Sequence, residues 1–480
     1  MPSNTSRYSG WLLQVVLLTL LSACAAVGPD YVKPTVETPL TFKEEDGWKV
    51  AQPKDAALSE KWWQLFEDAS LNELEEQVFI TNQNIILAEA QFRQARALKE
   101  ESKAAFYPNV TVGASATRSQ GSANTGRGTP TATSDFMLPV NLSWELDVWG
   151  RIRRSVEAST SALQASAADL AAVRLSVQAE LASDYFQSRT LDTQKQYLDE
   201  NIGYYQKSLE LTKNRYAAGI VSRADVLQAD NLLKSTQASM VDLGVQRAQL
   251  EHAIALLIGK PASSFSLPTA ALNYRPPHIP MAVPSELLER RPDIASAERH
   301  MAGANAEIGV ARAAYYPTVK LGTSIGLEAS DVGKWLSWPS RFWSVGPSVS
   351  ATVFDGGLRR AQNDHAVAAY DAAVASYRQT VLNAFREVED NLAALRILEN
   401  EGKIQDDAVE SGRQTVIVTL NQYKAGIVGY LNVVSAQNTE LANRKAAIGI
   451  LGRRVAAAIS LVKALGGGWN ADSLAKAGAF

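Results

Sequence analysis

The sequence predicts a mainly helical α+β protein in which one unit is duplicated, giving four strands and two very long helices. Three observations predict it: motifs that recur at an offset of about 207 residues, four segments of polar–apolar alternation, and two long heptad stretches without proline. The chain has 480 residues and a formal net charge of −3. Because no basic patch accompanies this near-neutral charge, we expect no nucleic acid as a partner.

The duplication rests on four short motifs that return in the same order. The matched segments are 84–89 with 293–298, 105–110 with 314–319, 150–154 with 356–360, and 214–221 with 421–428. Four ordered matches at one offset predict two copies of one structural unit. A proline-rich stretch from Pro261 to Pro284 lies between the copies and is expected to be a loop.

The strands are predicted from four segments of about ten residues in which polar and apolar side chains alternate. These segments begin near Val110, Phe136, Val319 and Val345, and aromatic residues gather at their ends. Alternation with aromatic ends is typical of barrel strands that face lipid on one side and water on the other. Alternation alone is also typical of any half-buried strand of a soluble protein.

The two long helices are predicted from heptad patterns. Between Arg151 and Tyr216 there is no proline, and apolar residues recur seven apart; a second such column runs from Val367 to Tyr423. About 66 helical residues make a rod of about 100 Å. A helix of about 25 residues before the strands and one of about 37 residues after the turn could stack end to end beside each rod.

The first 23 residues have the pattern of a signal peptide. Arg7 precedes an apolar run at Trp11–Leu21, which is too short to remain as a membrane-spanning helix. The segment Leu21–Cys24 resembles a bacterial lipobox, and Ala25 after it resembles a signal for outer-membrane sorting. We therefore expect Cys24, the only cysteine, to be lipidated. The alternative is an ordinary signal peptide with an incidental cysteine.

Four strands of one chain cannot stand alone in lipid, because each open edge leaves unpaired N–H and C=O groups in hydrocarbon. Other subunits must therefore close the sheet. Two copies would give about eight strands, whose interior fills with side chains, and three would give about twelve, which leave a lumen.

Motifs between about Tyr31 and Lys463 resemble the TolC-like outer-membrane efflux proteins, in the lipoprotein branch that works with resistance-nodulation-division pumps. The motifs are Trp62–Phe66, Arg215–Gly219, Asp225–Leu227, Pro284–Ile294 and Phe354–Gly357. The resemblance implies a homotrimer with a twelve-stranded transmembrane β-barrel, a mixed equatorial belt and a long coiled-coil α-helical barrel in the periplasm. It implies the function of a passive outer-membrane channel of a tripartite efflux pump, which carries small molecules such as drugs or toxic compounds outward.

The resemblance also implies partners and a division of the chain. The partners are outer-membrane lipid, a periplasmic adaptor protein and an inner-membrane resistance-nodulation-division pump. The expected division is a signal peptide at 1–23, a lipidated N-terminal and equatorial segment at 24–81, a first duct repeat at 82–260, a linker at 261–284, a second repeat at 285–463 and a tail at 464–480.

No catalytic set, metal-ligand spacing or phosphate-binding loop is visible in the sequence, so we expect neither an enzyme nor a cofactor. Two alternatives to the efflux duct remain. A structural coiled-coil lipoprotein spacer between the outer membrane and the cell wall would explain the rods but not the four alternating segments. A duct for type I protein secretion would fit the fold, but the lipobox argues against it.

The functional residues follow from two glycines and from the resemblance. Gly219 and Gly426 predict turns at positive φ after the long helices. In the resembled family, grooves beside these turns receive the adaptor, and the helices near the second turn close the duct. Motif matching carries the constriction to Asn432 and Ser435, beside Leu431, where the family has acidic residues.

A link that holds the tip shut is also implied by the resemblance. It carries over to Tyr423 and Asp225, whereas the position of the family's arginine holds Val428. Without acidic residues at the constriction, cation binding there should be far weaker. The alternative role for Asp225 is to cap the helix that follows Ser222.

Overall fold

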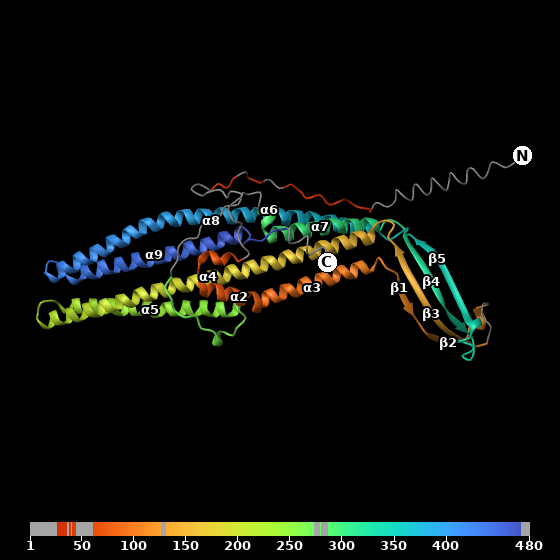
Figure 1. Ribbon diagram of the computed structural model, residues 1–480, viewed down its shortest axis with the longest axis horizontal. Helices are drawn as coiled ribbons and strands as arrows, with labels where there is room; N and C mark the ends of the chain where they lie inside the picture. The colour runs from red at the N-terminus through yellow and green to blue at the C-terminus, as the bar shows by residue number, and fades with distance from the viewer. Residues whose placement is uncertain are drawn as a thin grey trace.

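The computed structural model describes residues 26–35, 38–39, 41–44, 61–125, 131–272, 279 and 287–471. The protein is a long rod of helices with a β-sheet at one end (Figure 1). The predicted signal peptide, Cys24, much of the predicted linker and most of the predicted tail lie outside the described residues.

The same order of elements occurs twice along the chain. The elements are η1 (Trp62–Phe66), α2 (Ala69–Thr81), α3 (Gln83–Ala104), β1 (Asn109–Val112), β2 (Ser115–Ser119), η2 (Ala123–Thr125), β3 (Thr133–Leu146), α4 (Arg151–Ala217), α5 (Arg223–Leu257), η3 (Ala262–Ser264), α6 (Leu287–Arg290), α7 (Pro292–Ala313), β4 (Thr318–Ala329), η5 (Trp338–Ser340), β5 (Arg341–Ser350), α8 (Leu358–Lys424) and α9 (Tyr430–Ala464). Each repeat has a helix of 22 residues, strands, a helix of 67 residues and a helix of 35 residues. The predicted duplicated unit is therefore confirmed.

The sheet is antiparallel, in the order β1–β3–β4–β5, with β2 also paired to β3. β1 and β2 continue one register along β3, so the sheet has the four predicted strand positions. The sequence predicted one unbroken strand where β1 and β2 lie. The break occurs opposite Pro139, whose carbonyl accepts a hydrogen bond from the N–H of Gly113 at 3.0 Å. Because Pro139 has no N–H, the return bond of this pair cannot form.

The two faces of the sheet differ in polarity, as the alternation predicts. One face carries apolar cross-strand pairs, among them Leu138–Leu327, Val140–Ile325, Trp144–Leu321 and Val319–Val349. The other face carries polar pairs such as Asn141–Ser324, in which the hydroxyl donates to the amide oxygen at 2.8 Å. One face therefore suits hydrocarbon and the other suits water. Among the described residues, no strand pairs with the outer edges formed by β1, β2 and β5.

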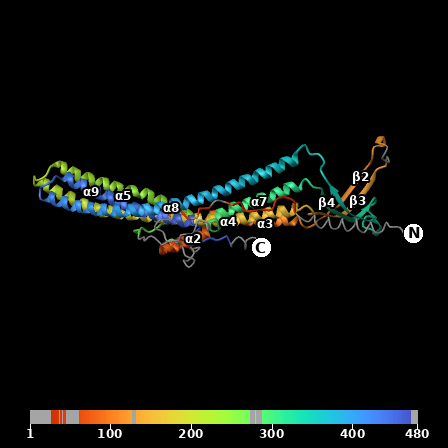
Figure 2. The ribbon, with the colours of Figure 1, turned by 90° about the horizontal axis from the view of Figure 1, so that it is seen from above.

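The helices form a layer of four columns. α3 and α5 lie end to end along α4, and α7 and α9 lie end to end along α8 (Figures 1 and 2). The heptad columns form the buried seams: Leu163 and Val177 of α4 and Val381 and Val388 of α8 are buried. α7 also packs on α4 and so joins the two repeats. None of the helices described combines the length and the apolar character needed to cross a membrane.

The segment 26–31 ties the two repeats together near the sheet. The N–H of Val27 donates to the carbonyl of Trp149 at 2.9 Å, beside the start of α4. The guanidinium of Arg154, in α4, binds the carboxylate of Asp30 at 2.8 Å. The buried amide of Asn305, in α7, donates to the backbone of this segment at 3.0 Å. The chain that follows the predicted lipidation site is thus fixed at the sheet end of the rod.

A belt of short elements, η1 and α2, lies against one side of the middle of the rod (Figure 2). η1 and α2 pack on α4 through a cluster that includes Trp62, Leu71 and Tyr185. The carboxylate of Asp68 accepts from the N–H of Leu71 at 3.0 Å and so caps α2. It also accepts from the hydroxyl of Tyr185 at 2.8 Å. No helix was predicted here from the sequence, so α2 is an addition to the predicted fold.

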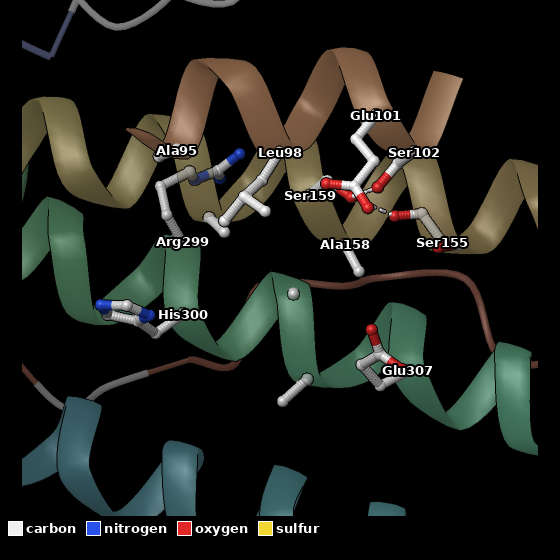
Figure 3. Close-up of a pocket in the computed structure, with 13 residues that line it drawn as sticks. Ala95, Leu98, Glu101, Ser102, Ser155, Ala158, Ser159, Arg299, His300 and Glu307 are labelled. Carbon is white, nitrogen blue, oxygen red and sulfur yellow. Dashed lines mark hydrogen bonds between the residues drawn. The ribbon is translucent and has the colours of Figure 1, made fainter. Parts of the chain in front are cut away.

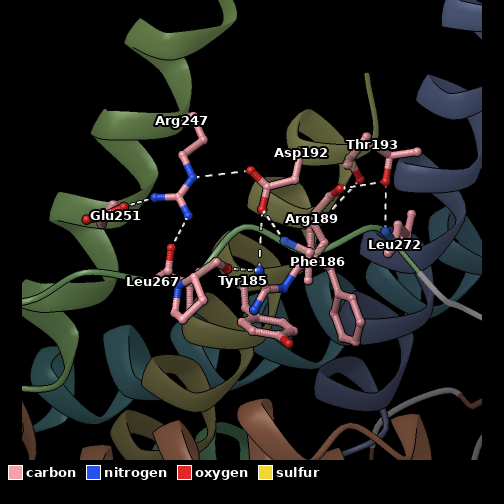
Figure 4. A network of polar contacts seen from close by, with 12 residues as sticks. Tyr185, Phe186, Arg189, Asp192, Thr193, Arg247, Glu251, Leu267 and Leu272 are labelled. Atoms are coloured by element: carbon pink, nitrogen blue, oxygen red, sulfur yellow. Dashed lines mark hydrogen bonds and ion pairs between the residues drawn. The ribbon is translucent and has the colours of Figure 1, made fainter. Parts of the chain in front are cut away.

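A buried polar cluster clips the chain that leaves α5 back onto α4 (Figure 4). Asp192, 3% exposed at its side chain, binds the guanidinium groups of Arg189 and Arg247, each at 3.3 Å. Its carboxylate also accepts from the N–H of Ala270 at 3.1 Å. Arg189 donates to the carbonyl of Pro268 at 2.5 Å. Two helices and the start of the predicted linker therefore share one charged centre.

Asp192→Ala should lower stability, because Arg189 would keep a buried positive charge without a carboxylate partner. We expect the free energy of unfolding to fall by about 3 kcal/mol, measured by thermal unfolding in detergent followed by circular dichroism. Glu410→Ala, which removes an exposed carboxylate paired with Arg413 on α8, is the matched control and should leave the midpoint unchanged. Equal midpoints for the wild type and Asp192→Ala would show that the clip adds no stability.

Candidate functional site at the helical tips

The end of the rod farthest from the sheet consists of two helical turns (Figure 1). We call α4 and α5, joined at Gly219, the first hairpin, and α8 and α9, joined at Gly426, the second hairpin. The two glycines have φ of 73° and 78°. In each turn the second residue after the helix cap, Ile220 or Ile427, donates its N–H to a carbonyl in the last helical turn at 2.9 Å. These bonds define a Schellman turn, so the predicted turns at positive φ are confirmed.

The tips expose apolar surface. A Cβ atom built on Gly219 or Gly426 would meet no atom within 4 Å. The side chains of Ile220, Leu227 and Ile427 are exposed beside these turns. Open backbone flanked by isoleucine and leucine side chains is typical of a surface that another protein covers.

Asp225 caps the second helix of the first hairpin. Its N–H donates to the hydroxyl of Ser222 at 3.3 Å, and its carboxylate accepts from the N–H of Ser222 at 3.0 Å. This capping box is the alternative role that the sequence left open. The hydroxyl of Tyr423 is buried and has no hydrogen-bond partner among the described residues. The implied Tyr423–Asp225 hydrogen bond is therefore absent from this structure, because the tyrosine points into a packed cluster.

Tyr423 packs instead against residues for which the sequence predicted no role in closing the tip. Its ring, 3% exposed, meets Tyr430 edge to face at 5.2 Å. The guanidinium of Arg215 lies 4.7 Å from the centre of the Tyr423 ring and donates to the Tyr423 carbonyl at 3.1 Å. The hydroxyl of Tyr430 lies 2.9 Å from that of Ser208. Arg215 and Ser208 belong to the first hairpin, so these contacts join the hairpins.

A further contact joins the hairpins nearer the belt. The hydroxyl of Tyr197, in α4, donates to the carboxylate of Glu440, in α9, at 2.5–2.6 Å. Burial and this acceptor raise the pKa of Tyr197 above its usual range, so the phenol stays protonated as a donor. The guanidinium of Arg444 lies 5.8 Å from the Tyr197 ring. The two hairpins are thus linked by polar contacts at several levels.

The predicted constriction residues lie on one face of α9. Leu431 is 62% exposed, and Asn432 and Ser435 are exposed as well. Leu431 and Asn432 lie four and three residues before Ser435, and these spacings bring side chains together on one helix face. The opposite face, with Tyr430 and Val433, is buried against the first hairpin. The three predicted residues are therefore free to face a pore or another copy of the chain.

The wall of the rod also contains a cavity of about 630 Å³ between α3, α4 and α7 (Figure 3). Leu98 points into it, and the hydroxyls of Ser102 and Ser159 meet at 2.6 Å along its side. Burial raises the pKa of Glu307 at its rim. Within the described chain, no group of three or more His, Cys, Asp or Glu side chains could hold a metal ion.

Comparison with known proteins gives matches over both repeats. The model of the family described as "Outer membrane efflux protein" matches residues 76–260 and 283–467. The pyoverdine export outer membrane protein OpmQ of Pseudomonas aeruginosa is 29% identical over 95% of this chain and 97% of its own. The cation efflux system protein CusC of Escherichia coli is 28% identical over 96% and 99%. The structure of the outer-membrane channel OprN is 31% identical, with a TM-score of 0.88 over 93% of this chain and 100% of that one.

Proposed function

The chain belongs to the outer membrane efflux protein family, and from that premise we propose that it is the exit duct of a tripartite efflux pump. Its relatives are outer-membrane efflux channels. The observation that carries the proposal is the amphipathic sheet with two open edges at the end of a rod of about 100 Å. Such a sheet fits the outer membrane, and such a rod reaches far into the periplasm.

We propose that three copies close the duct. The open edges of β1, β2 and β5 need partners in lipid, and twelve strands leave a lumen where eight would not. The helical columns support this, because their outer members expose rows of apolar side chains. These are Val241, Val245 and Leu256 on α5, and Ile397 and Ile404 on α8. A ring of three chains would bury both rows.

The remaining assignments are proposals that complete this picture. Lipid on Cys24 would anchor the chain next to segment 26–31, which is fixed to α4 and α7. A periplasmic adaptor would dock at Gly219 and Gly426, and an inner-membrane pump would supply the energy. We also keep the proposed division of the chain, with repeats at 82–260 and 285–463. The duct itself is proposed to be passive and not an enzyme.

The cargo is proposed to be small molecules such as drugs or toxic compounds. The names of two relatives give different cargo, pyoverdine for OpmQ and cations for CusC. This supports selection of cargo by the pump. A spacer lipoprotein would need no amphipathic sheet, so the sheet favours the duct over that alternative.

We propose that Leu431, Asn432 and Ser435 line the narrowest part of the duct at the periplasmic end. Their exposure on one face of α9 supports this role. Three neutral rings would hold the constriction by packing and hydrogen bonds, with little field to attract cations.

The docking role of the tips is tested by Gly219→Val and Gly426→Val. A β-branched side chain at positive φ distorts the turn and covers its open surface, so export should be lost while trimers remain. Drug susceptibility of a strain that lacks its own duct measures export, and native electrophoresis measures trimers. Gly429→Val is the control, because Gly429 has φ of −75° and open space around it. Normal export by both tip variants would contradict docking at these turns.

The duct and its constriction are tested together by Asn432→Asp. The wild-type protein should conduct in planar bilayers with weak ion selectivity. The variant places three carboxylates in a narrow pore and should shift the reversal potential under a KCl gradient toward that of potassium. Asp242→Asn changes the charge of an exposed residue on α5, in the first hairpin, and controls for a general effect of charge. A wild-type protein that does not conduct would overturn the duct, and an unchanged reversal potential in Asn432→Asp would remove Asn432 from the constriction.

A further inference from the structure

We propose that Arg215 is the latch that holds the two hairpins together and keeps the tip narrow, in place of a Tyr423–Asp225 hydrogen bond. The inference rests on the proposed function, because it concerns how that duct stays closed. It identifies a residue of the first hairpin that acts on the second through the buried ring and the backbone of Tyr423.

The latch is a two-part contact made by one guanidinium. Arg215 lies in the last turn of α4 and reaches across to the last turn of α8. Its Nη1 donates to the carbonyl of Tyr423 at 3.1 Å, and its Cζ lies 4.7 Å from the centre of the same ring. A planar guanidinium can serve both purposes at once, whereas an ammonium group is a compact point charge. A cation over a shielded aromatic ring is stabilised more than one at an open surface.

The electrostatics of the helix end strengthen the contact. The carbonyl of Tyr423 belongs to the last turn of α8, where the helix dipole leaves partial negative charge. That carbonyl also accepts from the N–H of Gly426 at 3.0 Å, so the arginine grips the turn itself. Among the described residues, no carboxylate forms an ion pair with Arg215 that would compete for its charge.

The two side chains of the alternative latch, Asp225 and Tyr423, do not bond to each other. The carboxylate of Asp225 completes the capping box with Ser222. The hydroxyl of Tyr423 is buried without a partner among the described residues. What Tyr423 offers to the first hairpin is therefore its ring and its carbonyl, and both are taken by Arg215.

The duplicated sequence shows that only the first repeat has an arginine at this position. Arg215 and Tyr216 of the first repeat match Gln422 and Tyr423 of the second. Tyr216 is 47% exposed, whereas Tyr423 is 3% exposed. At these matched positions the second hairpin has a glutamine and a buried tyrosine, and the first has an arginine and an exposed tyrosine. At the position of the family's arginine stands Val428, so the cation comes from α4 instead.

Contacts below the latch are neutral or farther from the tip. Ser208 meets Tyr430 through hydroxyls at 2.9 Å, and Tyr197 donates to Glu440 nearer the belt. Arg215 lies closest to the turns and supplies the only cation that bridges the described hairpins there. Release of Arg215 would therefore loosen the two turns, while the apolar cluster around Tyr423 and the lower contacts still hold the hairpins together.

The test compares two substitutions that the two latches rank in opposite order. Arg215→Gln places the residue of the matched position in the second repeat and removes both parts of the contact. Tyr423→Phe keeps the ring and the carbonyl and removes only the unpartnered hydroxyl. We expect Arg215→Gln to raise the ratio of open to closed tips about tenfold, seen as larger mean conductance in planar bilayers. Tyr423→Phe should conduct like the wild type.

Arg413→Gln, which removes an exposed arginine of α8 paired with Glu410 on the same helix, is the matched control and should also conduct like the wild type. Unchanged conductance of Arg215→Gln, beside a conducting wild type, would overturn the latch and leave the duct standing. Increased conductance of Tyr423→Phe would favour the hydroxyl link instead. A wild type without channel activity would overturn the proposed function. Circular dichroism at 222 nm shows whether each variant keeps its helices.

Discussion

The unpaired backbone at the edges of the sheet is the constraint on which the rest of the structure depends. β1, β2 and β5 present N–H and C=O groups that hydrocarbon cannot satisfy. The fold therefore makes sense only as part of a closed assembly. Closure by further copies also places the polar face, with pairs such as Asn141–Ser324, around water. The proposed ring would also bring the exposed apolar rows of α5 and α8 together, so the sheet and the helices favour the same closed assembly.

The duplicated unit gives both hairpins of the duct the same length. The residues at the tips that differ between the repeats form the contact between the hairpins. Both repeats have helices of 67 and 35 residues and the same glycine turn. The residues around the turns differ: the first repeat supplies Arg215 and the capping box of Ser222, and the second supplies the buried Tyr423. Two hairpins of equal length can then form a continuous wall. The contact between their tips is asymmetric, because the arginine comes from the first hairpin and the tyrosine from the second.

Patterns that repeat along the chain made most of the fold predictable. Heptads without proline predict α4 and α8, and alternation predicts the four strand positions. The break opposite Pro139 was missed because it depends on which residue faces which across two strands. α2 was missed because its helix is fixed by burial of residues such as Leu71 against α4. At the tip, the two glycine turns were predictable from the sequence. The contact of Arg215 with Tyr423 was not, since it joins positions 208 residues apart in the sequence through a ring and a carbonyl.

The central claim is that three chains close the sheet and the helical wall into one duct. Native mass spectrometry of the assembly extracted from the outer membrane tests it most directly, because the mass counts the chains. The account predicts three copies. A particle of one chain would leave both edges of the sheet open, and one of two chains would leave no lumen; either result would contradict the account.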